Sequence, residues 1–564
     1  MELAYNLSSK VSDFAIFYSK GDYSKVVDLI NKNGITFENI WCYIDSLMEL
    51  GNIERAIAIL EDWKSKIAQN NDLAEWYYYW GITKLNLSLY NEAIEAFNLS
   101  KDIDRKISIK SDLKIVLSFI DIGEFTKASE IIKSLLTKLK KSNSEEFALA
   151  NHLKGDLYYF KGEYFKALKY YNKALKIRET LKNIVNIVKT KNNIGIIYFE
   201  QKRYTEALIL FQNIYKDIEH KNLVRLEANI LTNIGLIYHD TGKLAEGLKY
   251  HVRALSLREY INDPISIASS LNNISLIYID QGRLKLALEK LKNAYELEKE
   301  KKNLLAQAGS LNNQGIVLLE MGLVDEALRI LKESLKIWKS LKTPEPIVET
   351  LFLIVKANFD RKTLTNQNNE LLELTSMSER YSSDYTQIFW NLSFALVKEQ
   401  EQKYSEALNH LENALKFGDF DYQYKIMCYE IVLRISLKKW QISMDESDYI
   451  KINAELSHLE EISLENNLIS TLCKTYFIRA KLKKLMMLFS EAKEELTKLI
   501  SVANNAGLPL HVKLAEKELI DIVNAELIFD SISKPEIKPM EIEEVGTYLK
   551  VLMELISKQE DYKD

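Results

Sequence analysis

The most informative polar residues of this 564-residue chain are asparagines that recur every forty residues. A side-chain amide carries one acceptor and two donors, so it matches a peptide bond, which offers one of each. Asparagine is a poor helix former, and packing alone does not call for it within the apolar-periodic segments where it stands here. We interpret the set as a ladder that binds the main chain of an extended peptide: Asn192, Asn193, Asn233, Asn272, Asn273, Asn312 and Asn313. The alternative, compatible with the first, is that these amides bond neighbouring helices and fix their stacking.

A second row of residues is entirely acidic. Each acid stands seven residues after one of four asparagines, Asn193, Asn233, Asn273 and Asn313. The row consists of Glu200, Asp240, Asp280 and Glu320. If this row faces a binding groove, the ligand carries lysine or arginine. The alternative is ordinary solvated charge at a helix C-terminus, where the helix dipole mildly disfavours acids.

The residues around the asparagines repeat with the same period. Each unit has a small residue, an aromatic or apolar residue three positions later, a glycine in most units, and then a small and a large residue spaced by four. The small residue stands at Gly155, Gly195, Gly235, Ser275 and Gly315. Weaker copies extend upstream and downstream. Small residues suit the crossing of two helices, and a glycine suits the end of the first helix.

This pattern resembles the tetratricopeptide repeat, whose signature is a small residue, an aromatic residue and then Ala-x-x-x-Phe. The resemblance covers most of residues 10–502. The period is forty instead of thirty-four, and unit endings such as 174–179 and 254–259 are similar to those of kinesin light chains and Pins-type polarity adaptors. It implies an all-α, right-handed superhelical solenoid of antiparallel helix pairs, with about 11–13 repeats and the first helix of each pair on the concave face. Similar asparagines in those proteins imply a similar use here.

Changes in the pattern divide the chain. We expect N-terminal repeats over 1–140, the regular array over 141–342, and a degenerate repeat over 343–385, where 343–346 (Thr-Pro-Glu-Pro) breaks the helix. Further repeats follow over 386–527. The remainder, 528–564, is expected to hold a linker and an amphipathic helix, 541–558, that caps the stack.

Composition and motifs exclude several classes of function. The net charge of −5 gives no electrostatic footprint for nucleic acid, and no apolar run is long enough to enter a membrane. Neither metal-ligand spacing nor a phosphate-binding or nucleophile motif is present. We therefore expect no metal, cofactor or catalysis. The three cysteines are expected to be buried free thiols of a cytoplasmic protein: Cys42, Cys428 and Cys473.

Three functions remain open from the sequence. The first is a non-enzymatic scaffold or adaptor that binds a peptide or extended segment of a partner protein in its concave groove. The second is a signalling regulator whose superhelix changes shape when a peptide binds. The third is an architectural solenoid that assembles with copies of itself.

Overall fold

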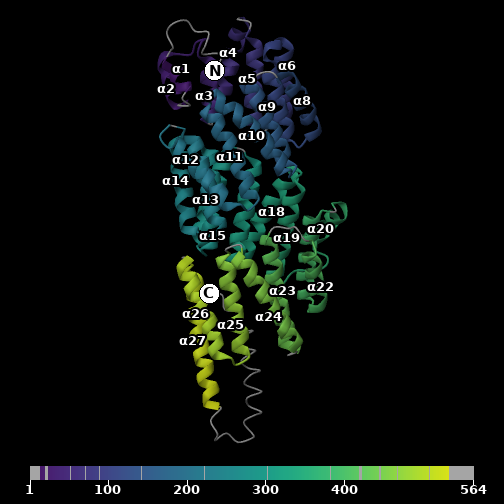
Figure 1. Ribbon diagram of the computed structural model, residues 1–564. Helices are drawn as coiled ribbons and strands as arrows, with labels where there is room; N and C mark the ends of the chain where they lie inside the picture. Colours follow the sequence, from purple (N-terminus) through teal and green to yellow (C-terminus); the bar gives the residue numbers. More distant parts are fainter. Residues whose placement is uncertain are drawn as a thin grey trace. The chain divides into compact units, whose positions relative to one another are not determined.

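The computed structural model describes residues 13–532, apart from 20–22, 51, 70–71, 88, 141–142, 222, 302, 382, 418–421, 444–445, 466–467 and 507. Over these residues the regular structure consists of 27 α-helices and a short 3-10 segment, Arg105–Ile107 (Figure 1). The predicted all-α class of antiparallel helix pairs is confirmed. The predicted capping helix over 541–558 lies outside the described residues.

The part of the chain before the regular array forms eight helices. They are α1 (Asp13–Ser19), α2 (Tyr23–Asn33), α3 (Ile40–Glu49), α4 (Ile53–Gln69), α5 (Leu73–Asn86), α6 (Tyr90–Ile103), α7 (Ser108–Asp121) and α8 (Phe125–Leu139). The regular array forms ten more, two per forty-residue unit. They are α9 (Glu145–Phe160), α10 (Tyr164–Leu181), α11 (Ile184–Glu200), α12 (Tyr204–Ile218), α13 (Val224–Asp240), α14 (Leu244–Tyr260), α15 (Pro264–Asp280), α16 (Leu284–Glu300), α17 (Leu304–Glu320) and α18 (Val324–Leu341).

Each first helix of the array ends on a left-handed residue, as the glycine pattern predicts. The φ angles are +71° at Gly162, +72° at Gly242 and +74° at Gly322. This conformation costs glycine little, because it lacks a Cβ atom. In the second unit Lys202 takes the same conformation, with φ +57°.

The repeat units share their core. Phe211 of α12 and Ile214 pack in one buried cluster with Ile230 and Ile234 of the following unit. A forty-residue helix pair cannot bury its apolar face alone, so stacking on the next pair supplies much of the stability. The recurring tyrosines also have a structural role. A basic residue of the same unit covers the ring, as Arg203 covers Tyr198 with its guanidinium carbon 4.4 Å from the ring centroid.

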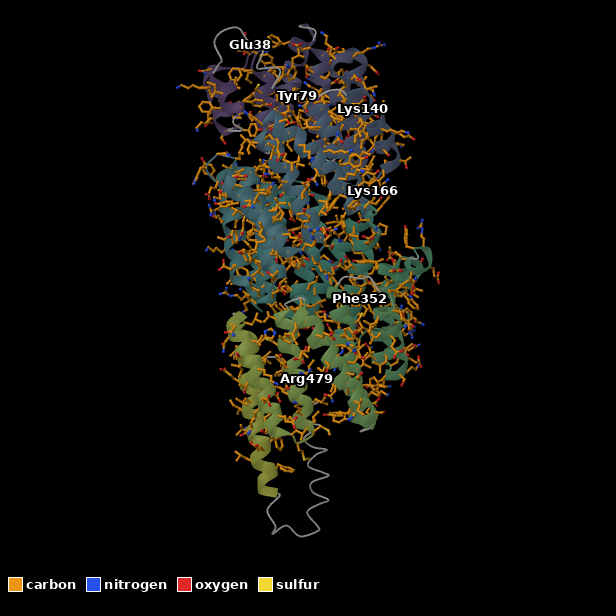
Figure 2. All side chains as sticks on the ribbon, in the orientation of Figure 1. Glu38, Tyr79, Lys140, Lys166, Phe352 and Arg479 are labelled. Atoms are coloured by element: carbon orange, nitrogen blue, oxygen red, sulfur yellow. The ribbon has the colours of Figure 1, made fainter. Side chains whose placement is uncertain are left out.

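The predicted helix break is present at 342–343, whereas residues 344–346, which were expected to belong to it, form the first turn of the next helix, and a further helix pair follows. Lys342 adopts a left-handed conformation after α18, and α19 (Pro344–Asp360) begins with a proline, which needs no N–H partner at that position. α20 (Asn369–Arg380) is short, and α21 (Asp384–Gln400) packs against α19. Phe352, labelled in Figure 2, is buried with its ring centroid 5.2 Å from that of Phe389.

The chain divides into two compact units, Met1–Ile279 with Arg283–Glu401, and Asp280–Gly282 with Gln402–Asp564. The remaining helices are α22 (Tyr404–Leu415), α23 (Tyr422–Ser443), α24 (Glu446–Glu465), α25 (Ile469–Leu485), α26 (Phe489–Ala506) and α27 (Pro509–Ile532). Across the described parts of the chain no helix is long and apolar enough to cross a membrane. The cysteines are free thiols; Cys428 and Cys473 are buried, as predicted, whereas Cys42 is only partly buried.

Candidate binding site along the first helices

In the second unit of the array, a glycine fixes how the first helix is turned. A Cβ atom on Gly195 of α11 would lie 2.6 Å from Cζ of Phe211 on α12, so the observed contact requires glycine. A residue two positions earlier is rotated about 200° around the helix. Asn193 therefore lies on the side of α11 that faces away from α12, where a chain running along the first helices could reach it.

The first asparagine of two pairs bonds the next unit. Nδ2 of Asn272 donates to Oγ of Ser310 at 3.0 Å and to Oε1 of Glu298 at 3.1 Å. Oδ1 of Asn312, which is buried, accepts from Oγ1 of Thr350 at 3.0 Å. For these two residues the structure shows the bonding to neighbouring helices that the stacking interpretation describes.

The asparagines of α11 and α13 also bond one another or the preceding unit. Nδ2 of Asn233 donates to Oδ1 of Asn192 at 2.7 Å. Nδ2 of Asn193 donates to Oδ1 of Asp156 at 3.2 Å, on α9. At this end of the row much of the amide capacity is therefore already used within the chain.

Asn273 of α15 and Asn313 of α17 differ from the others. Both side chains are half-buried, and within the described residues neither amide has a hydrogen-bond partner. Each retains two donors and an acceptor for another molecule. These two positions, one repeat apart, have the free capacity that a ladder for a bound main chain needs.

A glycine stands one helical turn before Asn313. A Cβ atom added to Gly309 would meet no atom within 4 Å, unlike one added to Gly195, so packing does not require glycine here. Glycine within a helix costs about 1 kcal/mol relative to alanine. The corresponding residue one repeat earlier, Ser269, is exposed and also small. Small residues beside the free amides leave room for close approach by another chain.

A cluster of buried titratable residues surrounds Asn193 on α11. Burial raises the pKa of Asp156 to about 6, although hydrogen bonds from Tyr171 and Asn193 act in the opposite direction. The hydroxyl of Tyr171 donates to Asp156 at 2.6 Å. Burial and the nearby Arg178 guanidinium lower the pKa of His152 to about 3, so this imidazole is neutral near pH 7.

The acidic row lies where the sequence places it, at the last residue of each first helix. Oδ2 of Asp240 accepts from the hydroxyl of Tyr204 at 3.5 Å, in the preceding unit. Glu200 raises the pKa of Tyr159, after the larger effect of burial. Glu200 and Glu320 are exposed, and Asp280 is half-buried and makes further contacts. The acids therefore lie near tyrosines in at least two units, and a ligand role for them stays a prediction.

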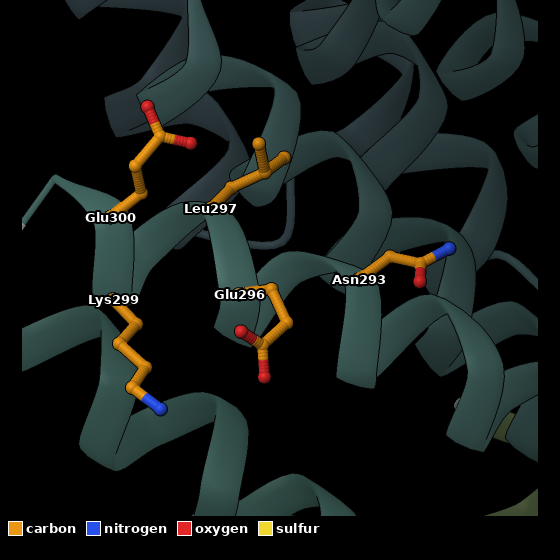
Figure 3. A pocket seen from close by; sticks show the side chains of 5 residues that line it. All are labelled: Asn293, Glu296, Leu297, Lys299 and Glu300. Atoms are coloured by element: carbon orange, nitrogen blue, oxygen red, sulfur yellow. The ribbon is translucent and has the colours of Figure 1, made fainter.

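One hollow lies between two first helices of the array, and another lies beside a second helix. One, of about 120 Å³, lies between α11 and α13 and includes part of the asparagine row; its lining residues are Val188, Lys189, Asn192, Asn193, Leu226, Asn229 and Ile230. A larger one, of about 660 Å³, lies beside the second helix α16, and Figure 3 shows its five lining side chains, all from that helix. The smaller hollow includes two residues of the predicted site, Asn192 and Asn193, whereas the larger one is an open surface beside one helix.

Sequence reasoning missed Lys189, Asn229 and Gly309. Each stands four residues before an asparagine of the row, so all three share its helix face. The forty-residue spacing of this column was the available signal. Within the residues that the structure describes, no group of acids, histidines and cysteines could hold a metal ion.

Comparison with known protein families agrees with the repeat pattern. The family model for the tetratricopeptide repeat matches residues 146–216, 226–300 and 266–340. These segments are tetratricopeptide repeats. The helices that carry the asparagine row are thus part of a protein-interaction domain of the tetratricopeptide class, and the predicted resemblance is confirmed. A search of curated protein sequences gives no significant match.

Several solved structures resemble the chain at low identity. A signal transduction ATPase (STAND protein) with a tetratricopeptide repeat sensor, from Pyrococcus horikoshii, is 14% identical with a TM-score of 0.42; the match covers 66% of this chain and 53% of that one, so the chain spans about half its length. A Rap protein complexed with competence and sporulation factor is 11% identical with a TM-score of 0.40, covering 74% and 98%. Nearly identical repeats assigned to a kinesin light chain of Podospora anserina are 12% identical with a TM-score of 0.31, covering 34% and 95%.

Proposed function

We propose that this chain is a non-enzymatic scaffold or adaptor that holds an extended segment of a partner protein along the first helices of its repeats. The observation that carries the proposal is the pair of partly buried, partnerless amides at Asn273 and Asn313. Within the residues that the structure describes, no hydrogen bond uses either amide, and asparagine within a helix has a cost. A bound peptide main chain would supply the missing acceptor and donor for each.

The spacing of the amides suits an extended chain. Helices that pack side by side lie about 8–10 Å apart, and an extended chain advances about 3.3 Å per residue. Amides on successive first helices would therefore meet about every third residue of the segment. Main-chain bonding of this kind depends little on the sequence of the segment, so side-chain selection must come from elsewhere along the groove.

The acidic row supports a preference for basic residues in the segment. Glu200 and Glu320 end their helices exposed, and an exposed carboxylate there attracts lysine or arginine without losing much hydration. This part of the proposal is separable from the amide contacts, because charge and main-chain bonding act on different atoms of the ligand.

The test is a capture experiment from lysate of the source organism with three forms of the full chain. They are the wild type, the Asn273→Ala/Asn313→Ala variant, and a matched control, Asn213→Ala/Asn293→Ala, which removes two exposed asparagines from the second helices α12 and α16. Circular dichroism first establishes equal helicity. We expect a protein retained by wild type and control to be lost from the variant.

Equal retention by all three forms would contradict the proposal. A partner identified in this way is then cut into synthetic segments. An extended segment must reproduce the binding, because capture of a folded domain alone would point to a different surface.

A further inference from the structure

The first unit of the regular array differs from the other four units around the turn that joins its two helices. Its first helix, α9, ends at Phe160, whereas the first helices of the other units end at an acid, as α11 does at Glu200. Its second helix, α10, carries Phe165 where the next unit has Thr205 and the last has Asp325. We propose that this surface binds the face of an anionic lipid membrane.

Both of these phenylalanines lie in solvent. Phe165 is 83% exposed, the highest fraction for a large hydrophobic side chain in the part of the chain that the structure describes, and Phe160 is 56% exposed. Covering an exposed aromatic ring with apolar material is favourable, because apolar surface leaves water. The two rings therefore form an apolar end to this surface that another body could cover.

A row of lysines continues from Phe165 along the same face of α10. Its members are Lys169, Lys173 and Lys176, all exposed, and each stands two residues after a buried residue of the helix. Two residues correspond to a rotation of about 200°. One of the buried residues, Tyr171, faces α9, since a Cβ atom on Gly155 would lie 2.5 Å from its ring. The lysines are therefore on the side of α10 that faces away from α9.

The charge of α10 sets it apart from the other second helices of the array. Its basic residues are four lysines and Arg178, against the single acid Glu179. In α12, α14, α16 and α18 the basic residues exceed the acids by at most one. The basic surface is thus a property of this unit and not of the repeat.

The three lysines of the row keep their charge available. Within the described residues none of them forms an ion pair with an acid. Nζ of Lys173 lies 5.0 Å from the ring centroid of Tyr170, a contact that leaves its charge intact. Lys166, labelled in Figure 2, is by contrast paired with Glu163. The row therefore attracts anions over its whole length.

A lipid surface suits this arrangement better than an acidic protein does. From the first to the last lysine the row extends about 10 Å along the helix, so its charges do not converge on one group. Lysine is depleted in interfaces between proteins, where arginine is enriched. The phosphates of a membrane are mobile and need no matching geometry, and the attractions of lysines near an anionic membrane add together. Aromatic rings beside such lysines can enter the headgroup region.

Membrane binding through α10 is compatible with the proposed function and does not depend on it. The surface lies on a second helix, whereas Asn273 and Asn313 lie on the first helices α15 and α17. The open amides therefore stay available while α10 is occupied. The chain would then hold a segment of its partner close to a membrane.

The test is flotation of the full chain with vesicles of phosphatidylcholine alone and of phosphatidylcholine mixed with phosphatidylserine. We expect binding to the mixed vesicles only, with affinity that falls as salt is added. Lys169→Glu/Lys173→Glu should weaken this binding about thirtyfold or more. The matched control Lys285→Glu/Lys292→Glu removes two exposed lysines from α16 and should bind like the wild type. Circular dichroism first establishes equal helicity.

A second variant separates insertion of the ring from attraction of charge. Phe165→Thr introduces the residue of the next unit, keeps every charge, and should weaken vesicle binding about tenfold. Binding that is unchanged in this variant, or lost equally in the α16 control, overturns the inference. So does a wild type that binds soluble polyglutamate as strongly as the mixed vesicles, because that result would assign the surface to an acidic protein. None of these assays contains a peptide ligand, so their outcome is independent of the proposed function.

Discussion

The two ends of the asparagine row carry the same residue type at the same repeat position, yet they differ in their bonding. On α11 and α13, Asn193 and Asn233 donate to groups of the preceding unit. On α15 and α17, Asn273 and Asn313 have no partner within the described residues. The row of amides is therefore divided into two parts. In the tied part the amides are hydrogen-bonded within the chain, and in the open part they have no partner within the described residues.

The cause of the difference lies in the neighbours and not in the asparagines. Asp156 stands one position after the small residue of its unit and accepts from Asn193. The equivalent residues of later units are apolar and cannot accept a hydrogen bond. For Asn273, the equivalent residue in the preceding unit is Leu236. Polar groups in the adjoining unit therefore decide whether an amide stabilises the stack or remains available to a ligand.

The largest expected effect is at the tied end, from Arg178→Ile. Arg178 is almost fully buried and bonds Glu145 at 3.0 Å and Thr190 at 2.6 Å. Its removal leaves those partners unpaired and should cost about 3 kcal/mol of stability. Urea unfolding, with hydrogen exchange of α9–α11, measures the loss.

The chain offers a matched repair for this variant. One repeat later the corresponding pair is apolar, Ile218 and Ile230, and both side chains are buried. Adding Thr190→Ile to Arg178→Ile introduces the same apolar pair at this interface and should restore much of the lost free energy of unfolding. A double variant no more stable than the single one would show that the polar bonds are not what holds this interface.

The tied end should also respond to pH through Asp156. Its pKa is about 6 in the fold, against an ordinary value of 3.8, so the fold binds a proton more tightly than the unfolded chain. Its contribution to stability therefore falls as pH rises between about 4 and 6, and the ionised carboxylate costs up to about 3 kcal/mol above that range.

Asp156→Asn should accordingly stabilise the chain at pH 8. His152 has the opposite effect: its lowered pKa makes stability rise with pH between about 3 and 6.5. The variant should therefore show a steeper acid loss of stability in thermal melts across pH 4–8. A variant that is less stable at pH 8 would contradict this account of the cluster.

A smaller effect is expected when the two adjacent asparagines of α15 are compared. Asn272→Ala removes bonds to Ser310 and to the buried Glu298, and should cost about 1–3 kcal/mol. Asn273→Ala removes no bond and replaces a poor helix former by the best one, so it should leave stability unchanged or slightly raised. Thermal melts of the two single variants decide the point. Equal destabilisation would remove the distinction between tied and open positions.

The smallest effect is expected at Gly309, and Gly195, a glycine that packing requires, gives the comparison. Gly309→Ala should stabilise the helix by about 1 kcal/mol, because its Cβ meets nothing, and should weaken binding of a synthetic segment from the captured partner. Gly195→Ala should destabilise the chain by about 1–3 kcal/mol, because its Cβ would collide with Phe211. Unfolding and peptide titration of both variants give the comparison, and a Gly309→Ala chain that binds normally would argue against close approach there.

The sequence predicts much of the fold because the repeat is a local pattern. Nearby residues account for the helix break before Pro344, for the left-handed Gly162 and for the contact of Gly195 with Phe211. The sequence also predicts which helix face carries the asparagines, since that follows from their spacing to the glycine.

The free or tied state of each amide could not be predicted in this way. It depends on side chains about forty residues away, such as Asp156 for Asn193 and Ser310 for Asn272. The orientation of Asn229 could not be predicted for the same reason, because its amide oxygen accepts from Arg258, on a different helix. Contacts between units, and not the repeat signature, set the chemistry of this surface.

The most direct test of the central claim measures stability and binding on two double variants, with a synthetic segment from the captured partner. We expect Asn273→Ala/Asn313→Ala to keep the melting temperature of the wild type and to bind the segment about thirtyfold more weakly, for two hydrogen bonds of about 1 kcal/mol each. We expect Asn272→Ala/Asn312→Ala to melt earlier and, while folded, to bind normally. The opposite pattern, with binding lost from the second variant and stability lost from the first, would contradict the division of the row into tied and open amides.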